Sequence, residues 1–407
     1  MQARFPVVVI TIMIGVWLAV ELCGASPAGA QVAPTILWDG AHLARVKAAW
    51  KKGDQTYARE LATITEEAQC ELAHEPYTVV ARARPKDTAY DPNDYYSEGL
   101  YWWPDPKTPV GLPYIRRDGE VNPESAYCRK DLGDFIKAVR NLSLAAYFTD
   151  EEKFAARAAL FIRAWFLDEK TRMNPNLRHA QAVPGRCTGR SSGLIDTARM
   201  RELVDAMQVL SLSPSWPEEE QKAVKVWFDK FLRWFLESKA GKEEAGGKNN
   251  LGTWYRQQVA LYAVYVGREE LAKPFFDSSL ERLLTSQVKP DGRQPLELKR
   301  VRAMTYCLFN LQAWEDIATL SRHFSEDYWN VGTPIGSRLK AGIDYLVPYA
   351  DPASQWHQAH AERTHYWPVL AQASFHYGEP KYREAIRKLP PVTEDHAWWR
   401  LVYSETP

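Results

Sequence analysis

The chain has 407 residues, of which 45% are apolar, and its 51 basic and 51 acidic side chains give a formal net charge of zero. This composition excludes a wholly disordered chain and supplies enough apolar side chains for one large core or two modest ones. Because a nucleic-acid-binding protein needs concentrated positive charge, the balanced charge argues against a nucleic-acid partner. The 16 Trp and 20 Tyr residues suit either sugar binding or the packing of large helices.

Residues 1–30 have the features of a secretory signal peptide. An apolar run from Phe5 to Leu22 follows a basic residue, and Ala28-Gly29-Ala30 forms a small-residue cleavage site before Gln31. We therefore expect an exported protein, periplasmic or secreted, with one mature domain over residues 31–407 and no membrane contact after cleavage. An uncleaved N-terminal anchor is the less favoured alternative.

The mature chain would keep four widely spaced cysteines, none of them in a Cys-x-x-Cys pair: Cys70, Cys128, Cys187 and Cys307. This spacing indicates no metal site. We expect buried free thiols, with one or two disulfides as the alternative in an oxidising compartment.

Apolar side chains recur with the period of an α-helix along most of the chain. The pattern predicts helical segments over residues 38–75, 131–147, 151–166, 195–210, 218–236, 253–266, 271–286, 296–320, 337–345 and 364–377. No run alternates convincingly with the two-residue period of a strand. The predicted class is therefore all-α, built from successive helical hairpins.

Residues 77–123 interrupt the helical pattern. Pro, Asp, Gly and aromatic residues dominate there, and residues 95–106 read Tyr-Tyr-Ser-Glu-Gly-Leu-Tyr-Trp-Trp-Pro-Asp-Pro. Loops of this length are usually functional or disordered, and so many aromatic side chains argue against disorder. Tyr101 and Trp102 are therefore candidates for substrate contact.

A second irregular segment, residues 174–190, contains Asn, His, Gln and three Arg among too many Pro and Gly residues for a helix. An ordinary solvated loop has the same composition. Cations and amides also suit the carboxylates and hydroxyls of an acidic polymer. The candidates for such contacts are His179, Gln181, Arg186 and Arg190.

Residues 246–255 read Gly-Gly-Lys-Asn-Asn-Leu-Gly-Thr-Trp-Tyr and lead into a predicted helix. Asn249 or Asn250 stands where an N-cap belongs, so both asparagines could serve only to cap the helix. The alternative is that their amides donate to an anionic ligand at the helix N-terminus. Trp254 and Tyr255, which follow directly, are candidates for substrate contact.

In residues 291–311, Tyr306 follows Arg300 by six residues and Arg302 by four. Six residues along a helix place two side chains about 120° apart, whereas four place them on one face. Either arginine could therefore be the cation that works beside Tyr306.

These four segments resemble, in the same order, segments of the alginate lyase superfamily, whose members are polysaccharide lyases built on an α/α toroid. The similar elements are Tyr-Trp-Trp-Pro-Asp-Pro, Asn-Pro-Asn-Leu with Pro-Gly-Arg-x-Thr-Gly-Arg, Asn-Asn-His-Gly-Thr-Trp-Tyr, and Glu-x-x-Arg followed by Tyr. The resemblance covers most of residues 95–311. It implies an incomplete barrel of helical hairpins with long loops along a cleft, and it implies that Tyr306 is the catalytic tyrosine.

A lyase of this kind cleaves a 4-linked polyuronate by β-elimination, which removes the C5 proton and expels the C4 oxygen. Arg300 and the asparagine amides would stabilise the charge that develops on the substrate carboxylate. Tyr306 would serve as base and acid if a neighbouring cation lowers its pKa. The reaction needs no metal or other cofactor, and we expect a monomer acting on an acidic polysaccharide of the alginate or glucuronan type.

Leu251 departs from the family pattern, which has histidine at this position. Leucine neither binds a carboxylate nor moves a proton, so three accounts stay open: His179 or an arginine takes over, the substrate differs, or the protein binds glycans without cutting them. A glycoside hydrolase is the rival enzyme and would need two carboxylic acids across the cleft. Candidates for that pair are Asp105, Asp196 and Glu297.

Overall fold

The computed structural model describes residues 31–82, 90–276, 278–356, 362–363, 365–391 and 396–403, so the expected signal peptide lies outside the described residues. Its α-helices are α1 (Gly40–Lys51), α2 (Ala58–Glu71), α3 (Cys128–Thr149), α4 (Glu152–Phe166), α5 (Met200–Leu210), α6 (Glu218–Glu237), α7 (Lys239–Ala245), α8 (Asn250–Val266), α9 (Glu269–Ala272), α10 (Ser278–Gln287), α11 (Pro295–Leu298), α12 (Ala303–Leu320), α13 (Pro334–Leu346), α14 (Tyr366–Tyr377), α15 (Pro380–Lys388) and α16 (Trp399–Val402). Short 3-10 helices are η1 (Pro123–Ser125), η2 (Ser191–Thr197), η3 (Lys273–Phe275), η4 (Ser321–Phe324) and η5 (Val347–Ala350).

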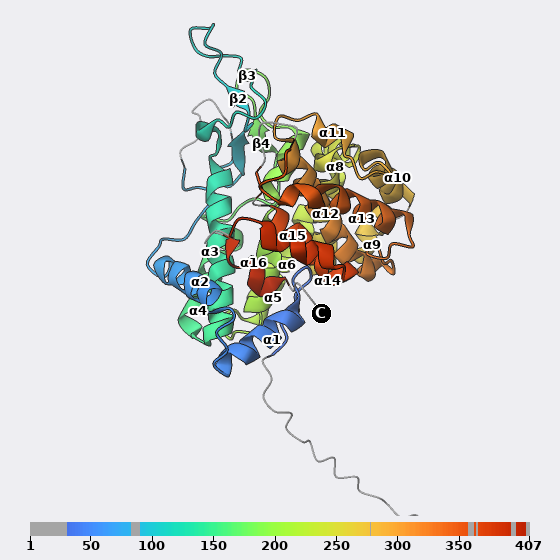
Figure 1. The fold of residues 1–407 in the computed structure, drawn as a ribbon. Helices are drawn as coiled ribbons and strands as arrows, with labels where there is room; N and C mark the ends of the chain where they lie inside the picture. The colour runs from blue at the N-terminus through green and yellow to red at the C-terminus, as the bar shows by residue number, and fades with distance from the viewer. Residues whose placement is uncertain are drawn as a thin grey trace, which may run out of the picture.

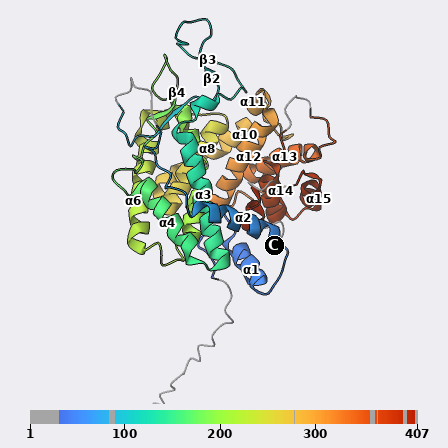
Figure 2. The same cartoon turned by 90° about the vertical axis from the view of Figure 1, so that its left-hand side faces the viewer.

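The helices form an α/α toroid (Figures 1 and 2). Contacts link α3 to α5, α5 to α8, α8 to α12 and α12 to α14, while α4 packs on α3, α6 on α8 and α13 on α12. The outer helices α4 and α6 have one apolar stripe to bury, whereas α8, α12 and α14 are buried on most of their surface. The prediction of an all-α toroid is confirmed.

Buried apolar side chains from Ala33 to Tyr403 form one extended cluster. Tryptophans supply much of its volume, and Trp165, Trp216 and Trp314 are completely or almost completely buried. Large aromatic rings contribute strongly to stability when they are packed in this way. The composition left open whether the tryptophans bind sugar or pack helices. These three pack helices.

Two small sheets, which the sequence pattern did not indicate, join the irregular segments. Strand β1 (Tyr96–Glu98) pairs in parallel with β4 (His179–Ala182), and β2 (Trp102–Trp103) pairs antiparallel with β3 (Ile115–Arg116). In both views these strands lie at one end of the toroid (Figures 1 and 2). The β1–β4 pairing therefore brings the two irregular segments together at this end of the toroid.

The predicted helix over residues 296–320 is wrong in one respect. It is divided into α11 and α12, because residues 299–302 form turns instead of helix. The break contains Arg300 and ends before Tyr306, so the position of Arg300 relative to Tyr306 is not that of two residues on one helix.

None of the helices in the described ranges combines the length and apolar character that a membrane crossing requires. All four cysteines of the described chain are free thiols. Cys128 and Cys307 are buried, as expected, whereas Cys70 and Cys187 are exposed and differ from the expectation.

Candidate active site

A cavity of about 740 Å³ opens at the end of the toroid that carries the sheets. Its walls come from the β2 and β3 loops, α3, η2, the start of α8 and the α11–α12 turn. The arginines that line it are Arg116, Arg129, Arg190, Arg199, Arg300 and Arg302, whereas Asp196 is the one carboxylic acid among the lining residues that the structure describes. A cavity with this excess of cations attracts an anionic ligand.

Tyr306 lies in the first turns of α12 and contacts two side chains that the sequence singled out. Its hydroxyl oxygen is 2.7 Å from that of Tyr101. The Nη2 group of Arg300 donates to it over 2.9 Å, and the Arg300 guanidinium lies 3.9 Å from the centre of its ring. The same Nη2 group also lies 3.0 Å from a carboxylate oxygen of Asp118, which holds the guanidinium in place. The structure thus brings a tyrosine, an arginine and a second tyrosine into one cluster.

The electrostatics of Tyr306 differ from the expectation that a cation lowers its pKa. Burial and the interaction with Tyr101 raise the pKa of Tyr306, and the opposing effect of Arg300 is smaller. Desolvation disfavours the charged phenolate in this half-buried place. Tyr306 is therefore a neutral phenol at pH 7 in the free protein.

Arg300, and not Arg302, contacts Tyr306. The helical-spacing argument for Arg302 fails because residues 299–302 are not helical. Arg302 pairs instead with Glu362, with 2.8 Å between Nη1 and Oε1, although it also lines the cavity.

The glycine-rich loop before α8 is needed for a close backbone approach. A Cβ atom at Gly252 would stand 2.2 Å from the carbonyl oxygen of Gly247, so the loop can fold onto the first turn of α8 only without side chains there. This contact brings residues 249–251 to the cavity wall.

Asn249 occupies the N-cap position of α8, but its side chain makes no capping hydrogen bond and lines the cavity. The idea that it serves only as a cap is therefore not supported. Asn250 donates its backbone N–H (2.9 Å) and its side-chain amide (2.7 Å) to Glu297. Burial raises the pKa of Glu297, which lies behind Asn250. Leu251 is half-buried and also lines the cavity.

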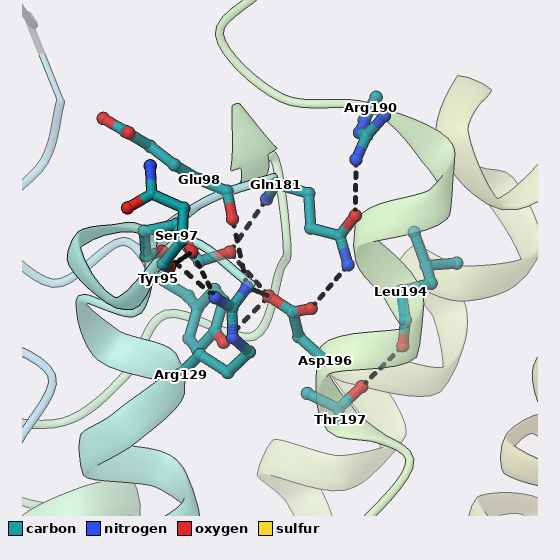
Figure 3. A network of polar contacts seen from close by, with 11 residues as sticks. Tyr95, Ser97, Glu98, Arg129, Gln181, Arg190, Leu194, Asp196 and Thr197 are labelled. Atoms are coloured by element: carbon teal, nitrogen blue, oxygen red, sulfur yellow. Dashed lines mark hydrogen bonds and ion pairs between the residues drawn. The ribbon is translucent and has the colours of Figure 1, made fainter. Parts of the chain in front are cut away.

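Asp196 is the centre of a polar network in the cavity wall, and Figure 3 shows the network. Its carboxylate accepts hydrogen bonds from Ser97 (2.5 Å), Tyr95 (3.1 Å) and the Gln181 amide (2.8 Å), and it lies 3.8 Å from Arg129. Since its oxygens are occupied in this way, Asp196 stabilises the junction of β1, β4 and η2.

Gln181 carries this network to the cavity wall. Its φ of 50° is unusual for a residue other than glycine, and backbone strain of this kind persists only where the surroundings hold it. The side-chain amide oxygen of Gln181, Oε1, accepts a 2.8 Å hydrogen bond from Arg190, as Figure 3 shows. Arg190 also lies 5.7 Å from the ring centre of Trp102, so both expected substrate contacts face the cavity together.

Several predicted site residues do not line the cavity. His179 is buried, with Nε2 3.6 Å from Asp94 and its ring centre 3.8 Å from that of Tyr90, so it has a structural position. Arg186 is exposed at the rim, 5.2 Å from the Trp102 ring.

The expected substrate contacts of Trp254 and Tyr255 need correction. Both side chains are about 98% buried or more. Trp254 packs on Phe309, and Tyr255 donates to the carbonyl oxygen of Phe235. They support the cavity from behind because their rings face the helices that pack on α8.

The carboxylic-acid pair of a hydrolase is not found in this cavity. Asp196 is bound within its network, Glu297 lies behind Asn250, and Asp105 is outside the lining residues. Within the described residues, no cluster of three His, Cys, Asp or Glu side chains is arranged to hold a metal ion.

Sequence reasoning missed several lining residues, among them Arg199, Thr305, Phe309 and His365. His365 comes from the C-terminal part of the chain, just before α14, and the predicted helix start at residue 364 was the only signal near it.

Comparison with known proteins found one family and similar solved structures. The family model described as alginate lyase matches residues 78–356. The structure is similar to that of an alginate lyase from Bacteroides ovatus, with 35% sequence identity, a TM-score of 0.84, and coverage of 92% of this chain and 100% of the other. It also resembles alginate lyase A1-III from Sphingomonas species A1 in fold, at 14% identity and a TM-score of 0.50, over 84% of this chain and 94% of the other. A search of curated proteins found no match.

Proposed function

This chain belongs to the alginate lyase family and is a polysaccharide lyase, and from this premise we propose that it is exported and cleaves a 4-linked polyuronate, of the alginate or glucuronan type, by β-elimination. The observation that carries the proposal is the contact of Arg300 and Tyr101 with the Tyr306 hydroxyl inside an arginine-lined cavity. The periplasm or the cell exterior is the proposed location.

Tyr306 moves the proton in the proposed reaction. Its phenolate form takes the proton from C5, and the electron pair left behind spreads onto the substrate carboxylate. The C4–oxygen bond then breaks, a C4–C5 double bond forms, and the Tyr306 phenol returns its proton to the leaving oxygen. One side chain can carry out both transfers because the proton leaves C5 and is delivered to the oxygen on the adjacent carbon, C4.

The cations and amides around Tyr306 stabilise the charge that develops in this reaction. Arg300 is oriented by Asp118 and faces the phenolic oxygen, and Asn249 presents a side chain with no capping bond at the N-terminus of α8. Preorganised donors of this kind lower the barrier because they need no rearrangement when charge appears. Asn250, held by Glu297, adds a fixed group next to Asn249.

The test is incubation of residues 31–407 with alginate, glucuronan and related polymers, while the ultraviolet absorbance of the unsaturated uronate and the number of new reducing ends are followed. We expect both signals to rise together. Reducing ends without absorbance would indicate a hydrolase. Binding without either signal would indicate a glycan-binding protein, which Leu251 alone favours.

The matched variant is Tyr306→Phe, which removes one hydroxyl and little volume. We expect its melting temperature to stay close to that of the wild type while the rate falls by roughly 10²–10⁴-fold, the usual contribution of an acid–base group. Near-normal turnover would remove Tyr306 from the mechanism.

A further inference from the structure

We propose that His365 binds a carboxylate of the polymer in the cavity and supplies the imidazole that position 251 lacks. This inference rests on the proposed function and names a substrate-binding residue outside residues 78–356, the range that the family model matches. Among the lining residues that the structure describes, His365 is the one histidine.

The position of His365 is set by a well-packed helix. It is the residue before α14, and Tyr366, the first residue of α14, is completely buried and donates to the carbonyl oxygen of Leu346 over 3.1 Å. The body of α14 packs on α12, which carries Tyr306. A half-buried side chain at the start of such a helix is held in the cavity wall without being covered.

Glu362 attaches the same segment to the catalytic helix. It accepts hydrogen bonds from Arg302 (2.8 Å) and from the hydroxyl of Thr305 (3.3 Å), which directly precedes Tyr306. The chain three residues before His365 is therefore fixed to the first turn of α12. The same contact with Glu362 is an ion pair, so Arg302 has less charge to offer a substrate.

Charged groups on several elements surround the imidazole. Glu362 is on its own segment, Arg199 and Glu202 come from α5 and its N-cap, and Arg199 is held by Glu202 at 3.0 Å. Burial is the main cause that lowers the pKa of His365. The ring is therefore neutral at pH 7, where it can donate one N–H, and it becomes a cation below its lowered pKa.

The other candidates for an imidazole contact are excluded by their positions. Leu251 lines the same cavity but carries no polar atom in its side chain. His179 lies outside the lining, between Asp94 and Tyr90. His365 is thus the residue that gives this cavity an imidazole for an anionic sugar.

The decisive experiment compares His365→Gln with the wild type on a polyuronate between pH 5 and 8. Sugar carboxylates, with a pKa of about 3.5, stay ionised throughout this range. For the wild type, KM should fall as the pH falls, because the imidazolium attracts the carboxylate. His365→Gln should raise KM by about 10-fold at the acidic end of this range, lose this pH dependence, and keep kcat within about threefold.

The matched control is His323→Gln, because His323 lines a separate cavity of about 440 Å³ between residues 32–41 and α14. It should leave KM and its pH dependence unchanged. Equal KM values and equal pH dependence in the wild type and His365→Gln would overturn the inference. A loss of kcat as large as that of Tyr306→Phe would overturn it as well, because His365 would then take part in the chemistry.

Two further measurements keep the test independent of folding and of catalysis. Thermal melts of the wild type and His365→Gln check folding, and we expect similar melting temperatures because His365 is half-buried and stands before the first residue of α14. Calorimetric binding of the polymer to Tyr306→Phe, with and without His365→Gln, measures affinity directly. If the wild type forms no unsaturated product, the proposed function fails. In the binding measurement, the inference fails if His365→Gln in the Tyr306→Phe background binds the polymer as tightly as Tyr306→Phe alone.

Discussion

The pKa of Tyr306 determines when elimination can begin, because only the phenolate accepts the C5 proton. Burial and Tyr101 raise this pKa, so the phenolate fraction is small at pH 7. Below the pKa, the phenolate fraction rises tenfold for each pH unit, and kcat/KM should rise with it. We therefore expect an alkaline pH optimum.

Tyr101→Phe tests the cause of that pH dependence. It removes the hydroxyl whose interaction raises the pKa of Tyr306 and leaves Arg300, which lowers it. The rise of kcat/KM should move to lower pH, as measured by rates from pH 6 to 10. Tyr114→Phe, which changes a tyrosine outside the cavity lining, is the control. A profile that does not move in Tyr101→Phe would show that Tyr101 does not set this pKa.

Leu251→His tests whether the family's histidine position still functions in this cavity. Leu251 is half-buried in the cavity wall at the start of α8, so an imidazole there would reach the substrate and the fold should be retained. We expect higher activity on a polyuronate, with a gain that changes near the imidazole pKa of about 6.5. A variant that loses roughly 1–3 kcal/mol of stability and gains no rate would show that leucine serves packing here.

The sequence predicted the site residues that belong to contiguous motifs. Arg300, Tyr306 and Asn249 line the cavity together, as the resemblance implied. The choice between Arg300 and Arg302 stayed open because helical periodicity does not reveal a turn over residues 299–302. His365 was missed because it reaches the cavity only through the packing of α14 on α12, which no local pattern encodes.

At the scale of elements, the start of α8 depends on two glycines that touch across the loop. Gly252→Ala would place a Cβ 2.2 Å from the Gly247 carbonyl oxygen, so the loop must move away from the helix. We expect a loss of about 1–3 kcal/mol in the free energy of unfolding, by analogy with overpacked cores, together with a lower rate because Asn249 and Asn250 shift.

The control for this change is Gly246→Ala, where the nearest atom, the Glu243 carbonyl oxygen, would be 3.3 Å from the new Cβ. Chemical denaturation and initial rates on the two variants make the comparison. Equal stability of the two variants would show that the close approach of Gly247 and Gly252 is not required.

Long helices were predicted well and short strands were not, for a physical reason. Helices such as α4 and α6 are fifteen or more residues long, and the apolar stripe along each of them is a local signal. Strands β1 and β4 have three and four residues and are separated by about 80 positions in the chain. Their pairing depends on the toroid that brings them together, so the pattern within each segment contains no trace of it.

At the scale of the whole molecule, buried carboxyl groups join distant parts of the chain. Asp205 on α5 accepts hydrogen bonds from the backbone N–H groups of Ile36, Leu37 and Trp38, and it fixes the N-terminal segment to the toroid. Asp316 on α12 pairs with Arg201 on α5 at 2.6 Å. These contacts connect the first described residues to the middle and the later helices of the fold.

The same groups predict how stability depends on pH. Burial raises the pKa of Asp205 to about 7 and that of Asp316 to about 6, above the unfolded value near 4. The folded state therefore binds more protons than the unfolded state between pH 4 and 7, so this contribution is complete below about pH 4 and is lost as the pH rises through 6 to 7. Glu202 acts in the opposite sense, because Arg199 and Arg140 lower its pKa to about 2 and its contribution is lost in acid.

We expect Asp205 and Asp316 to make the melting temperature fall as the pH rises from about 4 towards 8. Asp205→Asn keeps an oxygen that accepts backbone hydrogen bonds but cannot titrate. It should therefore reduce the loss in the free energy of unfolding over this pH range by up to about 4 kcal/mol, the equivalent of about three pKa units. Thermal melts from pH 4 to 8 measure the slope. The control is Asp150→Asn, which changes an exposed carboxylate paired with Lys47. Because the pKa of Asp150 is lowered, this variant should leave the fall between pH 5 and 8 unchanged. If Asp205→Asn retains the wild-type slope, Asp205 is ionised throughout this range, and its three backbone hydrogen bonds outweigh its burial.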